Sequence, residues 1–414
     1  MTGGRKIAVQ LMFPGRSLFG FLRERIDLVG PGAGRAPDIL VFPAGKGHLD
    51  FSAPEHRMPE DLAARVAAGE VVVVFDCSGE GVVHTPDRTD RLHAFLRRSG
   101  LPPERCVYVT QDRGYEAAYR AYCREGGWSA PMKVANYDYF IRRFFDRSPA
   151  EGEETFQARL EAFELRRPER ERRFVSLTFN PRWNKVLFLL WLIDQGLWDQ
   201  GFVSFGGFDL RGNREVRRGK MARELLRTPG FEDLAERLVG QIERLDSYGQ
   251  LLLGEVERAE SDDMKPLTTD CGLQEHDRSW FTVVPETEIS GPTRITEKPF
   301  KALTGFHPAI ILGNAGSLGL IRALGFRTFQ GFFDESYDQE PAPRRRFEMV
   351  AGEVRRLCGL EEARLARLER EFAEVLIHNA RHGLVELPRA YRERIDPAFL
   401  EELVSVLARE PAGA

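Results

Sequence analysis

The segment TEKPFKA places a carboxylate and an ammonium group side by side, at Glu297 and Lys298, directly after Thr296. Pro299 comes next, and because proline is common in the first turn of a helix, the spacing predicts that a helix begins here. The amino end of a helix carries unpaired N–H groups and a partial positive charge that suit a phosphate. Lys298 would add a point charge to such a site, and Glu297 could accept hydrogen bonds from hydroxyl groups. The pattern therefore fits a ligand that joins an anion to a polyol, such as a nucleotide sugar.

A simpler interpretation of the same pair is an ion pair on the protein surface at the start of a helix. Exposed pairs of this kind contribute less than about 1 kcal/mol to stability. The spacing of Glu297 and Lys298 alone leaves both interpretations open.

A glycine-rich turn, GNAGSLG, follows the apolar run AIIL and begins at Gly313 and Asn314. It matches neither the dinucleotide-binding fingerprint GxGxxG nor the P-loop fingerprint GxxxxGK[ST]. One interpretation is a tight turn that only starts a helix. The other is a turn whose backbone approaches a ribose or a phosphate, with Gly313 and Asn314 in contact with the ligand.

The segment FNPRWNK forms a similar junction after the apolar run FVSLTF. Arg182 could bind a diphosphate through the two-pronged geometry of its guanidinium group, which lysine cannot copy. Asn180 and Lys185, from the same segment, complete the expected donor-binding residues. The alternative is a solvent-exposed arginine after a turn.

An enzyme that moved a sugar from such a ligand to a hydroxyl group would also need a base that takes the proton from that hydroxyl. In FDCSGEGVVH, Asp76 and Glu80 lie just past an apolar run and beside glycines, so partial burial could raise the pKa of either carboxyl group. Glu80 is the first candidate and Asp76 the second. The alternative is that both carboxylates only cap or hold a loop.

The composition limits the possible classes of protein. With 414 residues, 42% hydrophobic residues and a net charge of -4, the chain is typical of a globular protein and not of a strongly basic nucleic-acid binder. Its five cysteines lack the CxxC spacing of a zinc site, which predicts a reducing compartment with no disulfide framework and no zinc site. The longest apolar run, Val186–Ile193, is too short to cross a bilayer. We expect a cytoplasmic protein, with peripheral membrane contact left open.

Strands and helices are expected to alternate along most of the chain, because continuous apolar runs that end at glycine are typical of parallel strands buried on both faces. The expected strands are 6–13, 38–45, 70–81, 106–110, 174–179, 202–207, 279–287 and 308–314. The expected helices between them include 58–69, 88–100 and 184–196. This pattern predicts the α/β class.

The order of these elements predicts four segments. They are a Rossmann-like domain at 1–150, a charged linker at 151–173, a second Rossmann-like domain at 174–346 and a helical segment at 347–414. Two such domains facing a cleft would place a ligand beyond the carboxyl ends of the strands.

Two blocks resemble a known family. FVSLTFNPRWNKVLFLLWL and TVVPETEISGPTRITEKPFKALTGFHPAIILG are similar to the second domain of the α-1,3-fucosyltransferases, and to a broad group of uncharacterised bacterial and phage proteins. The resemblance covers Phe174–Asp338 and is most specific at TEK. It implies a GT-B fold, in which Lys298 and Arg182 neutralise the donor diphosphate and Glu297 contacts sugar or ribose hydroxyls. It also implies transfer to a glycan, lipid-linked or small-molecule acceptor without a cofactor, and commonly without a metal.

Two other classes of function stay open. One is a non-catalytic protein that binds a nucleotide or a sugar. The other is a Rossmann oxidoreductase, which the missing GxGxxG motif disfavours. The sequence leaves the donor, the acceptor, the stereochemistry and the oligomeric state undetermined.

Overall fold

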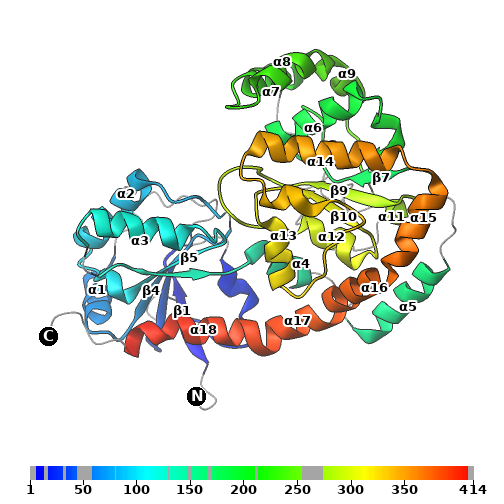
Figure 1. Ribbon diagram of the computed structural model, residues 1–414. Helices are drawn as coiled ribbons and strands as arrows, with labels where there is room; N and C mark the ends of the chain where they lie inside the picture. The colour runs from blue at the N-terminus through cyan, green and yellow to red at the C-terminus, as the bar shows by residue number, and fades with distance from the viewer. Residues whose placement is uncertain are drawn as a thin grey trace. The chain divides into compact units, whose positions relative to one another are not determined.

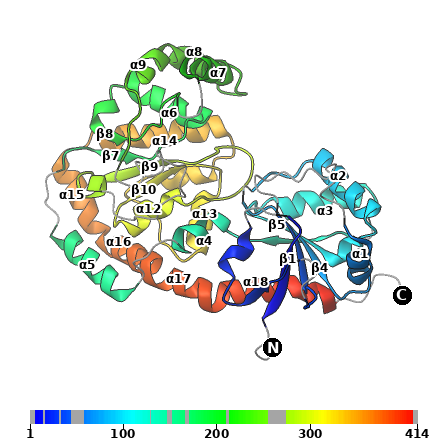
Figure 2. The ribbon, with the colours of Figure 1, turned by 180° about the vertical axis from the view of Figure 1, so that it is seen from behind.

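The computed structural model divides the chain into two compact units, each with its own parallel sheet (Figures 1 and 2). The structure describes residues 6–13, 17–30, 34–43, 58–79, 81–128, 130–146, 152–165, 170–209, 213–253 and 274–408. Unit 1 consists of Met1–Arg143, Pro292–Arg294 and Arg389–Ala414, and unit 2 of Phe144–Gly291 and Ile295–Pro388. The α/β class predicted from the sequence is confirmed.

Unit 1 contains a six-stranded parallel sheet with the order β2-β1-β3-β4-β5-β6. Its strands are β1 (Ile7–Leu11), β2 (Ile26–Leu28), β3 (Ile39–Pro43), β4 (Val72–Asp76), β5 (Cys106–Thr110) and β6 (Lys133–Asn136). The predicted strands that begin at residues 6, 38, 70 and 106 are present. The edge strand β2 has three residues, so its apolar run is too short to mark it in the sequence.

Successive residues of these strands are buried on opposite faces of the sheet, as the two-residue period of a strand requires. Val73 and Phe75 of β4 pack against one layer of helices, whereas Val72 and Val74 pack against the other. The first layer contains α1 (Glu60–Ala67), α2 (Pro86–Arg98) and α3 (Tyr115–Glu125). Both faces being covered explains why the strands are apolar without alternation.

The second layer of unit 1 includes α18 (Asp396–Val404), the last α-helix among the described residues, which lies along the sheet in Figure 1. Its apolar side chains Phe399 and Leu403 are buried against the strands. Asp396 fixes the start of the helix, accepting hydrogen bonds from Tyr137 Oη at 3.0 Å and Arg142 Nε at 3.1 Å. The segment 347–414, expected as one helical unit, is therefore divided: its final part from Arg389 belongs to unit 1.

Unit 2 contains a four-stranded parallel sheet with the order β10-β9-β7-β8. Its strands are β7 (Phe174–Ser176), β8 (Gly201–Val203), β9 (Phe281–Pro285) and β10 (Ala309–Leu312). All four lie within predicted strands or overlap their starts. Helices α6 (Trp183–Asp194) and α12 (Lys298–Thr304) pack against this sheet, above and below it in Figure 1.

The remaining helices of unit 2 surround this core. They are α7 (Arg214–Leu226), α8 (Glu232–Leu238), α9 (Ile242–Ser247), α11 (Gln274–Asp277), α13 (Ser317–Ala323), α14 (Pro343–Cys358), α15 (Glu362–Glu371) and α16 (Ala373–Arg381). Two more helices, α4 (Tyr139–Asp146) and α17 (Leu387–Ala390), contain the points at which the chain passes from one unit to the other. Two π-helical turns, His382–Glu386 and Tyr391–Ile395, flank α17.

The charged segment 151–173, interpreted from the sequence as a solvated helix with a linker, holds a helix that packs through aromatic side chains. Helix α5 (Glu153–Glu164) buries Phe156, whose ring stacks on Phe306 of unit 2. Phe163 lies seven residues further along the helix, and its ring stacks on the same Phe306 ring with centroids 5.0 Å apart. The charged composition of 151–173 hid this because two aromatic residues are enough to fix the helix.

Candidate functional site

The carboxyl edge of the unit 2 sheet gathers most of the expected ligand-binding residues. Glu286 directly follows β9 and is the centre of the group: its N–H donates to Leu312 O of β10 at 2.9 Å. Its main-chain oxygen accepts from Asn184 Nδ2 of α6, also at 2.9 Å. The segments after β7, β9 and β10 are thereby held together at one end of the sheet, where parallel α/β sheets bind their ligands.

The carboxylate of Glu286 positions the segment before α12. It accepts hydrogen bonds from the Thr296 N–H at 3.1 Å, from Thr296 Oγ1 at 2.6 Å and from the Thr287 N–H at 3.1 Å. Glu286 was not singled out from the sequence. The available signal was its place directly after a continuous apolar strand, the same signal that selected Asp76 in unit 1.

Glu297 and Lys298 form an ion pair with a distance of 3.1 Å between Nζ and Oε1. The side chains of Glu297 and Lys298 are only 5% and 18% exposed, so the pair is not the solvent-exposed one of the simpler interpretation. Lys298 Nζ also donates to Thr296 Oγ1 at 3.0 Å. Burial acts to raise the pKa of Glu297, but Lys298 and Lys301 outweigh it and leave the pKa below its ordinary value. Glu297 is therefore a carboxylate whose lone pairs can accept from hydroxyl groups.

The predicted helix start at Lys298 is confirmed, with Pro299 in the first turn of α12. However, α12 has only seven residues, whereas α6 has twelve. Because the dipole builds up over successive aligned peptides, the amino end of α6 is the stronger location for an anion. The N-cap residue of α6, Arg182, makes no side-chain capping hydrogen bond.

Lys185 lies in the first turn of α6 and is only 2% exposed. Among the residues that the structure describes, no hydrogen-bond or ion-pair partner reaches its ammonium group. The pKa of Lys185 is lowered to about 7, first by burial and then by the nearby charge of Lys298, whereas Glu286 and Glu297 act in the opposite direction. A buried lysine without a direct partner is unusual, since such charges are otherwise paired.

The neighbouring Asn184 has a similar feature. Its side-chain Nδ2 donates to the main-chain oxygen of Glu286, but its buried Oδ1 has no hydrogen-bond partner in the described part of the chain. Buried polar atoms that lack a partner are uncommon in folded proteins. The first turn of α6 therefore presents a cationic donor and an amide acceptor that the surrounding described residues do not satisfy.

The other expected donor-binding residues lie at the same edge but differ in exposure. The side chain of Arg182 is 49% exposed and is 3.8 Å from Glu288. Gly313 sits so close to Glu286 that an added Cβ atom would be 3.3 Å from its Cγ. Asn314 is buried, and its carbonyl oxygen accepts from Ser317 Oγ at 2.7 Å. Asn180 is exposed, and no described contact joins it to the group.

Of the two candidate bases in unit 1, Asp76 lies within the described residues. Asp76 is 2% exposed and accepts four hydrogen bonds. The donors are Ser17 Oγ, the Leu18 N–H, the Ser78 N–H and Ser78 Oγ, at 2.5–3.2 Å. Burial raises the pKa of Asp76, but these donors occupy all four lone-pair sites of the carboxylate. Its geometry is that of a loop-holding carboxylate, the alternative that the sequence left open. Glu80 lies outside the described residues.

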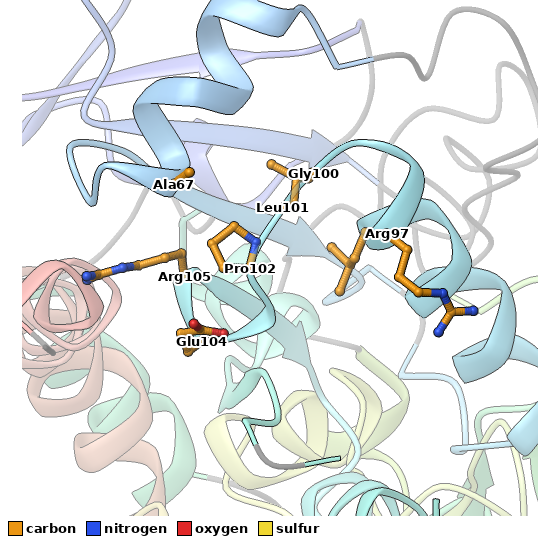
Figure 3. Close-up of a pocket in the computed structure, with 8 residues that line it drawn as sticks. Ala67, Arg97, Gly100, Leu101, Pro102, Glu104 and Arg105 are labelled. Carbon is orange, nitrogen blue, oxygen red and sulfur yellow. The ribbon is translucent and has the colours of Figure 1, made fainter. Parts of the chain in front are cut away.

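Two surface hollows lie away from these residues. In unit 1, a hollow of about 380 Å³ is lined by Leu96, Arg97, Glu104 and Arg105 among others, at the amino end of β5 (Figure 3). Arg105 extends toward the C-terminal helical segment, where it donates to Val406 O at 2.9 Å. The guanidinium group of Arg105 therefore stabilises the packing of the C-terminal segment on unit 1.

The second hollow, of about 170 Å³ in unit 2, lies between α6, α8 and α14 and is lined by Trp191, Arg237, Arg344 and Arg355 among others. Arg344 is paired there with Asp233 and Glu348.

The described residues contain no group of three or more His, Cys, Asp or Glu side chains arranged to hold a metal ion. Among the helices that the structure describes, none combines the length and apolar character needed to span a bilayer. Four cysteines, Cys77, Cys106, Cys123 and Cys358, are buried free thiols, and Cys271 lies outside the described residues.

No model of a known protein family matches the chain, and no curated protein matches it.

Proposed function

We propose that the protein is a glycosyltransferase that moves a sugar from a nucleoside-diphosphate donor to a hydroxyl group of an acceptor. The observation that carries the proposal is the combination of Lys185, Glu297 and Lys298 at the carboxyl edge of one parallel sheet. Cations held there would stabilise the negative charge that develops on the leaving diphosphate. The ionised Glu297 would accept hydrogen bonds from sugar or ribose hydroxyls.

In this proposal the two units correspond to the two domains of a GT-B enzyme, with unit 2 binding the donor. Lys298 and Arg182 contact the diphosphate, and Lys185 adds its positive charge to the site. The turn at Gly313 approaches the nucleotide. Transfer is inverting and does not depend on a metal. Because Asp76 has no open lone pair, Glu80 is the candidate for the acceptor base.

A thermal-shift panel with UDP, GDP, NAD and nucleotide sugars tests the proposal. We expect a nucleoside diphosphate to raise the unfolding midpoint, because a ligand that binds only the folded state stabilises it. Lys298→Ala should weaken that binding by roughly 10- to 100-fold, since a hydrogen bond to a charged group contributes about 1.5–3 kcal/mol. Lys220→Ala, an exposed lysine of α7, is the matched control and should bind as the wild type does.

Donor hydrolysis or transfer separates the proposal from the alternatives. A protein that binds the nucleotide sugar but never releases its sugar would be a non-catalytic binder. Stabilisation by NAD in place of nucleoside diphosphates would favour the oxidoreductase. If none of these ligands shifts the midpoint, the proposed function is wrong.

A further inference from the structure

The amino end of α6 combines two independent features of an anion site. The helix has twelve residues, long enough for its dipole to favour a negative charge at this end. Lys185 in its first turn is a buried cation with no direct partner among the described residues. Asn184 beside it has a buried side-chain oxygen that is likewise unsatisfied within the described chain. The described residues therefore leave a buried cation and a buried side-chain oxygen without partners at this end of α6.

The charges that act on Lys185 come from three neighbouring segments. Glu286 follows β9, Glu297 and Lys298 begin α12, and Arg182 is the N-cap of α6 itself. The two carboxylates are already engaged: Glu286 by Thr296 and Thr287, and Glu297 by Lys298. Lys185 therefore lacks a counter-ion of its own, and a bound anion would supply one.

We propose that a nucleoside diphosphate bound at the amino end of α6 causes Lys185 to take up one proton. The inference deepens the proposed function and rests on it. The proton comes from the solvent and forms an N–H bond at Nζ, and no other bond is made or broken. Because the folded protein already holds the pKa of Lys185 at about 7, the amine is largely neutral at pH 8 until the anion arrives.

Anion binding and the protonation of Lys185 favour each other. An anion close to Lys185 favours its charged form, so the pKa of Lys185 is higher in the complex than in the free protein. Binding is then strongest below pH 7, where the ammonium is already present, and weakens as the pH rises above 7. A transferase would use this linkage at release of the sugar, because the product diphosphate carries one more negative charge than the donor.

Isothermal titration of GDP and UDP into the full chain at pH 8, in buffers of different ionisation enthalpy, measures the protons exchanged. We expect uptake close to one proton per bound diphosphate, and affinity roughly tenfold or more weaker at pH 9 than at pH 7.5. The terminal phosphate is fully ionised over this range, so it does not contribute. Lys185→Met should abolish the uptake and flatten the pH dependence, and Lys220→Met should leave both unchanged.

The outcomes separate the two proposals. Diphosphate binding with no proton uptake, or with uptake that persists in Lys185→Met, overturns the role of Lys185 and leaves the proposed function standing. Absence of any binding by UDP and GDP overturns both. If Lys185→Met does not fold, Lys185→Arg serves in its place: its guanidinium stays charged at every pH tested, so proton uptake should again be lost.

Discussion

At the scale of single residues, Lys185 is the most unusual side chain of the site. Lysine is rarely buried without a partner, because removing an ammonium group from water is costly. Its place in the first turn of α6 was expected from the sequence, but its burial was not. The packing of α6 against the sheet, the segment after β9 and the start of α12 removes it from water, and a single segment of sequence does not record that packing.

The cost of burying Lys185 predicts a pH-dependent gain in stability when it is replaced. Burial lowers the pKa of Lys185 from 10.5 to about 7, so between these values the unfolded chain binds more protons than the folded one. The penalty is complete below pH 7 and declines as the pH rises toward 10.5. Lys185→Met should therefore raise the free energy of unfolding by about 1–4 kcal/mol at pH 6.

Urea unfolding of the wild type and Lys185→Met at pH 6 and pH 9 measures this effect. The advantage of the variant should be clearly smaller at pH 9. Lys220→Met, whose lysine is exposed on α7, should show no such trend. An equal advantage at both pH values would mean that Lys185 does not titrate in the folded protein near pH 7.

At the scale of elements, the turn between β10 and α13 depends on the absence of a side chain at Gly313. A Cβ atom there would lie 3.0 Å from Ser317 Oγ and 3.3 Å from Glu286 Cγ, so it would press on the carboxylate that holds Thr296. We expect Gly313→Ala to destabilise the protein by about 1–3 kcal/mol and to weaken diphosphate binding.

Gly319, in the same GNAGSLG segment, provides the matched control. It lies inside α13, and an added Cβ would meet nothing within 4 Å. Gly319→Ala should stabilise the protein by about 0.5–1 kcal/mol, because alanine is the better helix former. Chemical denaturation and GDP titration of both variants measure the difference. Equal stability and affinity of the two variants would show that the turn tolerates a side chain.

The extent to which these elements were predictable follows from their length and surroundings. Strands such as β5, found at the predicted residues Cys106–Thr110, are continuous apolar runs because helices cover both faces. Because ligands bind beyond the carboxyl ends of such strands, the polar residues that follow these runs could be predicted as candidates for the site. The edge strand β2 was missed because its apolar run is only three residues long. Glu286 follows an apolar strand as Asp76 does, but its central role depends on its partners Asn184 and Thr296, which the local pattern does not reveal.

At the scale of the whole molecule, the chain returns to unit 1 from Arg389 onward, and α18 packs there. The segment 347–414 was predicted to be helical, but an amphipathic helical pattern shows only that one face is buried, not which sheet buries it. The structure places α18 on the unit 1 sheet, with Asp396 accepting from Arg142 and Tyr137. The segment from Phe399 to Val406 thus contributes to the core of the first sheet.

This arrangement predicts that a change near the C-terminus destabilises unit 1. Leu403 is fully buried against the sheet, whereas Glu401, two residues earlier on the same helix, is exposed. Leu403→Ala should cost about 2–5 kcal/mol through lost apolar contact and the cavity that remains. Glu401→Ala should change stability by less than about 0.5 kcal/mol.

Hydrogen exchange measured by mass spectrometry locates the effect. In Leu403→Ala, we expect faster exchange in strands β1 to β6, because all six contribute side chains to the hydrophobic cluster that contains Leu403 and opening of this unit becomes easier. Exchange in β9 and β10 should stay close to that of the wild type if unit 2 is stable on its own. Faster exchange only in unit 2, or none anywhere, would contradict the docking of α18 on the first sheet.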